Sequence, residues 1–226
     1  MRFAITIVCL PLLMSAQEVP SVLRALASQS RLTTEVSLES SSPRGGADAV
    51  VRSAKRGGGF VTVSECRDTG LRRSLRLPTG TSLADSLDMI VSLDQSHYWT
   101  IEGEVVNVLP NHNMPEVMRT IIANFEWNTA DTIQLTIQRL SQVDEIRTQI
   151  KKWGGKQGVD VGIGLQKPPR IIAGQATSQA LGEHREARGL NFLLTLNRIV
   201  ASYGTAFWWY EERTCGDQKT FEIGGH

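Results

Sequence analysis

Apolar residues along the chain change spacing at residue 97, and this change predicts a helix followed by a β-hairpin. In residues 81–94, apolar side chains recur at the spacing of one helix face. Ser82 or Thr81 stands where a hydroxyl caps the first turn. Residues 97–110 then alternate around a Glu-Gly-Glu turn and end at Pro110, which predicts a hairpin. The apolar stripe consists of Leu83, Leu87, Ile90 and Val91.

The chain before this helix has shorter patterns. Residues 17–28 carry apolar residues on one side of a helix, residues 31–39 alternate like a strand, and residues 71–78 predict a half-buried strand. Residues 40–58 are rich in Ser, Gly and basic side chains. We therefore expect a flexible, exposed basic insertion there, with one helical turn near 47–54.

The middle of the chain, residues 113–156, predicts a helical bridge. Apolar residues keep helical spacing over 115–125, again from about 129 to 140, and from 141 to the stop at Gly154-Gly155. The Gly- and Pro-punctuated stretch that follows favours a connector with short strands at most.

One segment occurs twice. Residues 80–99 and 189–208 align without a gap, pairing Gly80 with Gly189, Asp88 with Asn197, and Trp99 with Trp208. This alignment predicts one supersecondary unit used twice, although any helix followed by a strand imposes similar apolar spacing. The second copy has the matching core positions Phe192, Leu196, Ile199, Val200 and Trp208.

The fold class that follows is α+β, built from two small β-α-β-β-like units. The first unit is expected at 17–112, and the second at 157–226. Residues 182–189 lack the apolar alternation of residues 71–77, so the second unit is expected to be partial, with its incoming strand missing or held at an exposed edge.

Residues 75–110, LRLPTGTSLADSLDMIVSLDQSHYWTIEGEVVNVLP, resemble the short N-terminal module of secretins and of signalling TonB-dependent receptors. In that module an amphipathic strand and a helix precede an aromatic strand and a hairpin that ends in Pro. Residues 189–223 resemble a partial second copy. The resemblance implies a periplasmic interaction domain that binds proteins and catalyses nothing. It identifies no site residues, and no outer-membrane barrel or secretin channel follows residue 110.

The first sixteen residues predict a secretory signal peptide. Arg2 precedes an apolar run from Phe3 to Met14, and the small residues Ser15 and Ala16 follow. A short uncleaved anchor is the alternative, because twelve apolar residues are too few to cross a bilayer. We expect an exported chain, periplasmic or secreted, with no membrane span once the signal is removed.

Two cysteines, Cys66 and Cys215, remain after Cys9 leaves with the signal peptide. In an oxidising compartment they are expected to form a disulfide, and two unrelated thiols are the alternative. Neither cysteine stands in a CxxC spacing or beside a His, which argues against metal binding and thiol catalysis.

Charge and motif content narrow the function classes. Lys and Arg number 24 against 23 Asp and Glu, so the chain has no field that would attract nucleic acid. We find no cofactor or metal motif and no catalytic constellation. His184 in EHRE and His112 in a loop are the histidines that a hydrolase could use.

The aromatic residues FWWY, 207–210, are expected to point alternately to the two faces of a strand. Trp208 aligns with Trp99 and is expected in the core, so Trp209 faces the other way. Trp209, with Tyr210, is the candidate partner surface, unless the middle helices cover it.

Three functions remain open. The first is a non-enzymatic protein-interaction module of the bacterial cell envelope, with another envelope protein as its partner. The second is an envelope signalling or regulatory domain that docks through residues 44–76. The third is an exported hydrolase with its site between the two units.

Overall fold

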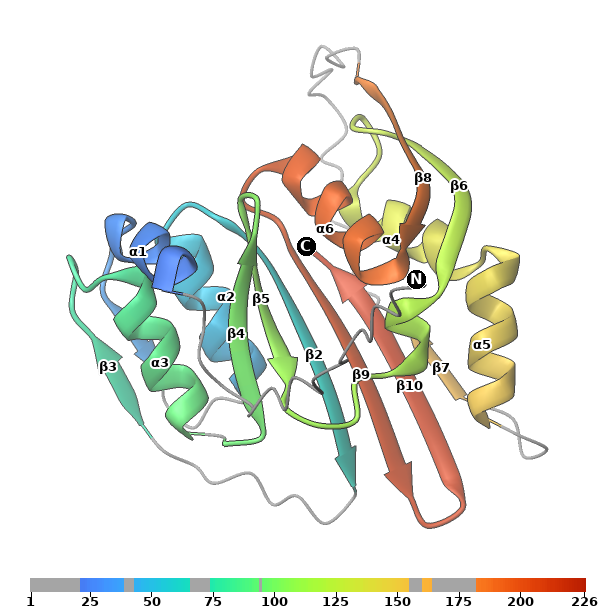
Figure 1. Cartoon of the computed structure of the whole chain (residues 1–226), viewed down its shortest axis with the longest axis horizontal. Helices are drawn as coiled ribbons and strands as arrows, with labels where there is room; N and C mark the ends of the chain where they lie inside the picture. The colour runs from blue at the N-terminus through green and yellow to red at the C-terminus, as the bar shows by residue number, and fades with distance from the viewer. Residues whose placement is uncertain (1–20, 39–42, 66–73, 94, 155–159, 164–181) are drawn as a thin grey trace, which may run out of the picture.

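A six-stranded mixed sheet runs through the middle of the computed structural model, which describes residues 21–38, 43–65, 74–93, 95–154, 160–163 and 182–226. Figure 1 shows β2 between the green β5 and the red β9, so strands distant in sequence are neighbours. In spatial order the strands are β4 (His97–Glu102), β5 (Val105–Pro110), β2 (Gly57–Glu65), β9 (Phe207–Cys215), β10 (Gln218–Gly225) and β7 (Asp160–Ile163).

Two antiparallel pairs of strands and a set of helices surround this sheet, and the fold is α+β as predicted. The pairs are β1 (Val36–Leu38) with β3 (Leu75–Leu77), and β6 (Ile121–Asn128) with β8 (His184–Asn191). The helices are α1 (Ser21–Gln29), α2 (Pro43–Ser53), α3 (Leu83–Leu93), η1 (Glu116–Arg119), α4 (Ile133–Ser141), α5 (Asp144–Gly154) and α6 (Phe192–Tyr203).

The two halves of the chain have the same topology. Unit 1, residues 36–110, has a small sheet β1-β3 and a three-stranded sheet β4-β5-β2. Unit 2, residues 121–225, has the corresponding sheets β6-β8 and β9-β10-β7. In both units the hairpin is antiparallel and its second strand pairs in parallel with a strand from earlier in the unit. One parallel contact, β2 with β9, joins the two sheets into one.

The two aligned helices also begin in the same way. Gly80 and Gly189 both have positive φ, +87° and +63°, a conformation that glycine adopts without steric cost. Ser82 and Asn191, which also align, each accept a hydrogen bond from the backbone N–H three residues further on, at 3.1 and 2.8 Å. Both are helix N-caps, and Ser82 is thereby confirmed as the cap of α3.

The aligned tryptophans make matching hydrogen bonds to their own helices. Trp99 donates its indole N–H to Asp88 on α3 at 2.8 Å, and Trp208 donates to Asn197 on α6 at 3.1 Å. Both indoles are almost fully buried, where an unpaired N–H would be costly. The polar side chain at this helix position therefore serves the same purpose in both units.

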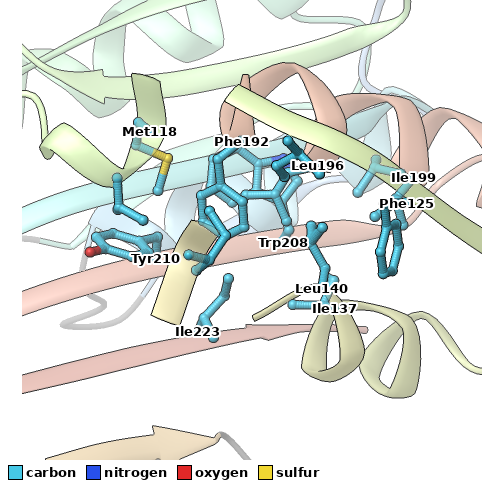
Figure 2. Close-up of a cluster of buried hydrophobic side chains, with 14 of the residues drawn as sticks. Met118, Phe125, Ile137, Leu140, Phe192, Leu196, Ile199, Trp208, Tyr210 and Ile223 are labelled. Carbon is cyan, nitrogen blue, oxygen red and sulfur yellow. The ribbon is translucent and has the colours of Figure 1, made fainter. Parts of the chain in front are cut away.

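The helices of the two units cover opposite faces of the shared sheet. On the α3 face, α2 and α3 pack over Phe207 and Trp209, together with Trp99 of β4. On the α6 face, α4 and α6 pack over Trp208 and Tyr210. Figure 2 shows Trp208 beside Phe192 and Leu196, with Phe125 next to Ile199. Neighbouring residues of β9 therefore contribute to two separate cores, as strand geometry requires.

The ten predicted core residues were identified well from spacing. Nine are buried, and Val91 is half-buried against the α3-face core. The nine buried residues are Leu83, Leu87, Ile90, Trp99, Phe192, Leu196, Ile199, Val200 and Trp208.

The flexible insertion predicted at 40–58 is wrong for the residues described. Residues 43–53 form α2, which buries Ala47, Val50 and Val51. Residues 57–65 form β2, a central strand. Glycine is needed at the start of β2 because the Trp208 indole lies over Gly59, and a Cβ there would overlap it. The glycines that resembled a loop therefore let two strands and a large side chain approach closely.

The helical bridge predicted at 113–156 is wrong in its first part. A short 3-10 helix ends at Arg119, and residues 121–128 form strand β6. Met118, Ile122 and Phe125 are buried at spacings of three and four, the spacing that suggested a helix. The other two predicted helices are present as α4 and α5, and Thr132 caps α4 by accepting from Leu135 N–H.

The second unit is complete, which corrects the expectation of a partial copy. Its incoming strand is β8, paired with β6 from the segment expected to be a bridge. Only Ala187 of β8 is fully buried, so this strand has no apolar alternation to detect. Strand β8 belongs to a two-stranded, largely exposed sheet, which explains its polar sequence. The sequence had also allowed an incoming strand held at an exposed edge, and β8 fits that alternative.

Cys215 is disulfide-bonded. The predicted partner, Cys66, lies outside the described residues, but the register next to it is defined. Glu65 pairs with Thr214, and each of these residues directly precedes one of the two cysteines. This register supports the predicted Cys66–Cys215 pairing, which stays a prediction.

Peptide mapping under non-reducing conditions should recover a linked peptide that contains Cys66 and Cys215. Replacing both cysteines by Ser should lower the free energy of unfolding by about 4 kcal/mol, because the bond closes a loop of about 150 residues. Recovery of Cys66 with a free thiol would contradict the pairing.

The Gly59→Ala variant should lower the free energy of unfolding by about 2 to 3 kcal/mol, because the added methyl displaces the Trp208 indole at the contact between the units. Urea denaturation measures this loss. Ser64→Ala, in the exposed half of the same strand, is the matched control and should cost far less. Equal losses for the two variants would contradict the close packing of β2 against β9.

Candidate interaction surface

The predicted partner surface, Trp209 and Tyr210, is wrong because both side chains are buried. Their exposed fractions are 6% and 1%. Trp209 lies on the α3 face, where the Arg44 guanidinium of α2 stands 5.2 Å from its ring centre. Its indole N–H donates to Glu222 at 3.1 Å. Trp209 is therefore structural, and it is covered by α2 rather than by the middle helices.

Charged side chains reinforce this contact between unit 1 and unit 2. Asp48 of α2 accepts hydrogen bonds from Arg52, one turn on, and from His226 Nε2 at 3.1 Å. The His226 ring also stacks obliquely on Trp209, 5.5 Å away. Burial tends to raise the pKa of Asp48, but hydrogen bonds from His226 and Arg52 outweigh it and hold that pKa below its usual value.

Where the structure describes residues 44–76, the suggested docking arm is packed into the fold. Arg44 contacts Trp209, Arg52 contacts His226, and residues 57–65 form the strand that joins the two units. Deleting 40–58 would remove α2 and the start of β2, so the fold would not stay intact.

Tyr210 points into the α6 face and forms a buried polar pair. Its hydroxyl donates to Glu212 at 2.5 Å, and Glu212 is 7% exposed. Burial raises the pKa of Glu212, although the Tyr210 hydroxyl and Lys219 act to lower it. Burial and the neighbouring carboxylate likewise raise the pKa of Tyr210. The pair lies outside the groove described below, so we assign it a structural role.

The histidines have separate environments. His97 is buried, stacks on Phe60 at 5.0 Å, and donates from Nε2 to the Val61 carbonyl at 3.1 Å. The backbone groups of β2 point alternately to its two neighbours, and Gly58 N–H donates toward β9. Val61 therefore directs its carbonyl toward the end of β5. Pro110 at that end has no N–H to donate to it. His97 therefore replaces a missing ladder bond.

The two histidines suggested for a hydrolase do not meet a shared site. His112 is exposed after β5, whereas His184 lies on β8 and its Nε2 is 3.5 Å from a Glu126 carboxylate oxygen. That pair is open to solvent, with side chains 67% and 47% exposed. A general base needs a perturbed environment and an adjacent nucleophile, and an exposed surface pair provides neither by itself.

A groove between β6 and α4 is the concave feature that we identify as the candidate site. Its volume is about 680 Å³, and it is shallow and open to solvent. Strand β6 contributes one wall and α4 the other. The lining residues are Asn124, Phe125, Glu126, Leu135, Gln138, Arg139 and Gln142.

Side chains of α4 and α5 bond to backbone groups of β6 that face away from β8. On one side β6 pairs with β8. On the other side, the Ala123 N–H donates to Glu145 of α5 at 3.1 Å, and Arg139 of α4 donates to the Glu126 carbonyl at 3.4 Å. The edge of β6 that faces away from β8 therefore borders the groove, with α4 and α5 holding its ends.

The groove walls combine one exposed apolar side chain with several polar ones. Leu135 is 43% exposed and supplies an apolar contact. The side-chain amides of Asn124, Gln138 and Gln142 can each donate and accept, as a peptide backbone does. Arg139 is held in place by Asp131 at 3.0 Å. The lining residues include no Ser, Thr, Cys or His, and Glu126 is the one carboxylate among them.

The sequence interpretation missed this groove because it predicted residues 115–125 as helix. Leu135 falls outside the stripe of Ile133, Ile137 and Leu140 on α4, but a single apolar residue on a protein surface is common and does not by itself indicate a contact.

Among the residues that the structure describes, no group of three or more His, Cys, Asp or Glu side chains is arranged to hold a metal ion. The helices of this part of the chain are also too short or too polar to cross a membrane.

Comparisons of the chain with protein-family models, with curated proteins and with solved structures found no match.

Glu212→Gln should become more stable relative to the wild type as pH rises. A raised carboxyl pKa means that the folded state favours the protonated form. The protonated Glu212 therefore adds to the stability of the wild type below the pKa of the unfolded chain, near 4.5. This added stability is lost as pH rises through the pKa of the folded state. Gln keeps an oxygen that accepts from Tyr210 and does not ionise.

Urea unfolding at pH 4 and pH 7.5 measures the effect. The gain should be about 1 kcal/mol for each unit by which the pKa is raised. Glu211→Gln, on the opposite face of β9, is the control and should show no such gain. A Glu212→Gln difference that is the same at both pH values would contradict the raised pKa.

Proposed function

We propose that this chain is an exported, non-enzymatic interaction protein of the bacterial cell envelope, which binds another envelope protein. The observation that carries this proposal is the groove between β6 and α4. It combines an exposed leucine with three side-chain amides, which can contact the side chains and the backbone of an extended polypeptide.

Two sequence features support the cell compartment and the class. Residues 1–16 have the pattern of a secretory signal, and residues 75–110 resemble a module that binds proteins in the periplasm. The order of elements from β3 to β5, strand, helix and hairpin, is the order that the resemblance implies. Cys215 in a disulfide is consistent with an oxidising compartment.

The rigid placement of the groove also favours binding. Both of its walls belong to unit 2, and α4 packs on the α6 face through Ile133, Ile137 and Leu140. A partner would therefore meet a preformed surface, which reduces the entropy lost on binding.

A photo-activated benzophenone amino acid at position 135 tests the proposal. In cells that produce the protein, illumination should yield a covalent adduct of discrete mass in the envelope fraction. The matched control is position 89, where Met89 is similarly exposed, at 39%, on helix α3, which lies on the other side of the fold from β6 (Figure 1). No adduct at 135, or equal adducts at both positions, would contradict the proposal.

A further inference from the structure

Strand β4 is an outer strand of the six-stranded sheet, and among the strands that the structure describes it pairs only with β5. Asn111 N–H donates to the Ser96 carbonyl, so the even-numbered residues of β4 bond to β5. Trp99 and Ile101 therefore direct their backbone N–H and C=O groups away from the sheet. We call this side of β4 the free edge. Figure 1 shows β4 with α1 and α3 to its left and β5 to its right.

The free edge lacks the features that usually keep an outer strand from pairing with another chain. Such strands are commonly protected by Pro, by charged side chains or by a bulge. Residues 98–101 contain neither Pro nor a charged side chain, and they pair with β5 in unbroken register. The backbone groups of Trp99 and Ile101 can therefore bond to an added strand.

Helix α1 supplies an apolar surface beside the free edge, since it lies against both α3 and β4. Leu23 packs into the α3-face core, and Arg24 forms an ion pair with Asp88 of α3. The flank of α1 opposite Arg24 carries Val22 and Leu26, one turn apart and 68% and 47% exposed. Because the Arg24 flank faces α3, the apolar flank faces away from α3, on the side of the free edge.

Two carboxylates lie at one end of the free edge. Glu102 ends β4 and Glu104 follows in the turn, and both are exposed. Glu102 accepts a hydrogen bond from Asn197 at 3.0 Å, and within the described part of the chain neither carboxylate has a Lys or Arg partner. A cation on an added strand would therefore be attracted to this end.

We propose that β4 binds an extended segment of another protein, which joins the sheet at the free edge as an antiparallel strand. Antiparallel pairs are slightly more stable per residue than parallel ones. In this direction the segment begins beside Glu102 and Glu104, so it carries Lys or Arg there. In the run that follows, apolar side chains alternate with polar ones, and the apolar ones contact Val22 and Leu26. The free edge is separate from the groove between β6 and α4, so this inference goes beyond the function proposed above.

Amide exchange measured by NMR on the full chain tests the proposal, with the end-blocked peptide Lys-Lys-Val-Thr-Val-Thr-Val as the probe. In the free protein, the amides of Trp99 and Ile101 should exchange quickly, whereas those of Tyr98 and Thr100 should exchange slowly because they bond to β5. The peptide should slow Trp99 and Ile101 by at least about tenfold and leave Tyr98 and Thr100 unchanged.

No slowing at peptide concentrations up to about 1 mM would overturn the proposal. Slow exchange of Trp99 and Ile101 in the free protein would also overturn it, because the edge would then be covered by a second copy or by another segment of this chain. A protein that fails this test can still give an adduct at position 135, so the free edge and the groove are tested separately.

Matched changes test the two side-chain contacts. Replacing both Lys residues of the peptide by Glu should weaken binding about tenfold, because like charges then meet at Glu102 and Glu104. Leu26→Ser should weaken binding about fivefold by removing apolar contact, whereas Met89→Ser, at an exposed position of α3, should leave it unchanged. Equal binding of the Lys and Glu peptides, or equal binding by Leu26→Ser and the wild type, would contradict the proposed strand addition.

Discussion

The parallel pairing of β2 with β9 is the contact on which the rest of this structure depends. It joins two three-stranded sheets into one. Helices of each unit can then pack against strands of the other unit. Gly59 permits the contact because the Trp208 indole occupies the space of its missing side chain. Neither three-stranded sheet would otherwise have a cover for its second face, since the helices of each unit pack on one face only.

The aromatic residues of β9 show how one strand supplies both cores. Phe207 and Trp209 lie under α2 of unit 1, while Trp208 and Tyr210 lie under the helices of unit 2. Four consecutive large side chains would be unusual in a strand with one solvent face, and they are expected in a strand buried on both. The FWWY run is thus a consequence of joining two units, and the candidate interaction surface lies elsewhere, along β6.

Residues with a local signal were predictable from the sequence. Spacing identified α3, its Ser82 cap and nine core residues, and the gapless alignment paired Trp99 with Trp208. Long-range pairing was not predictable. Strand β8 is polar because its partner β6 leaves it exposed, and β6 was read as helix because its buried residues lie three and four apart. The glycines of β2 suggested a loop because the indole that requires glycine at position 59 is 149 residues away. Strand β6 forms one wall of the groove, so the groove could not be found while residues 115–125 were predicted to be a helix.

Native-state hydrogen exchange tests the central claim most directly. If β2–β9 makes one cooperative body, the backbone amides of Phe60, Val108 and Tyr210 should exchange with one free energy of opening, equal to that of global unfolding. These amides lie in the junction strand, in unit 1 and in unit 2. An opening of unit 1 at a clearly lower free energy, with Val108 exchanging while Tyr210 stays protected, would contradict the account.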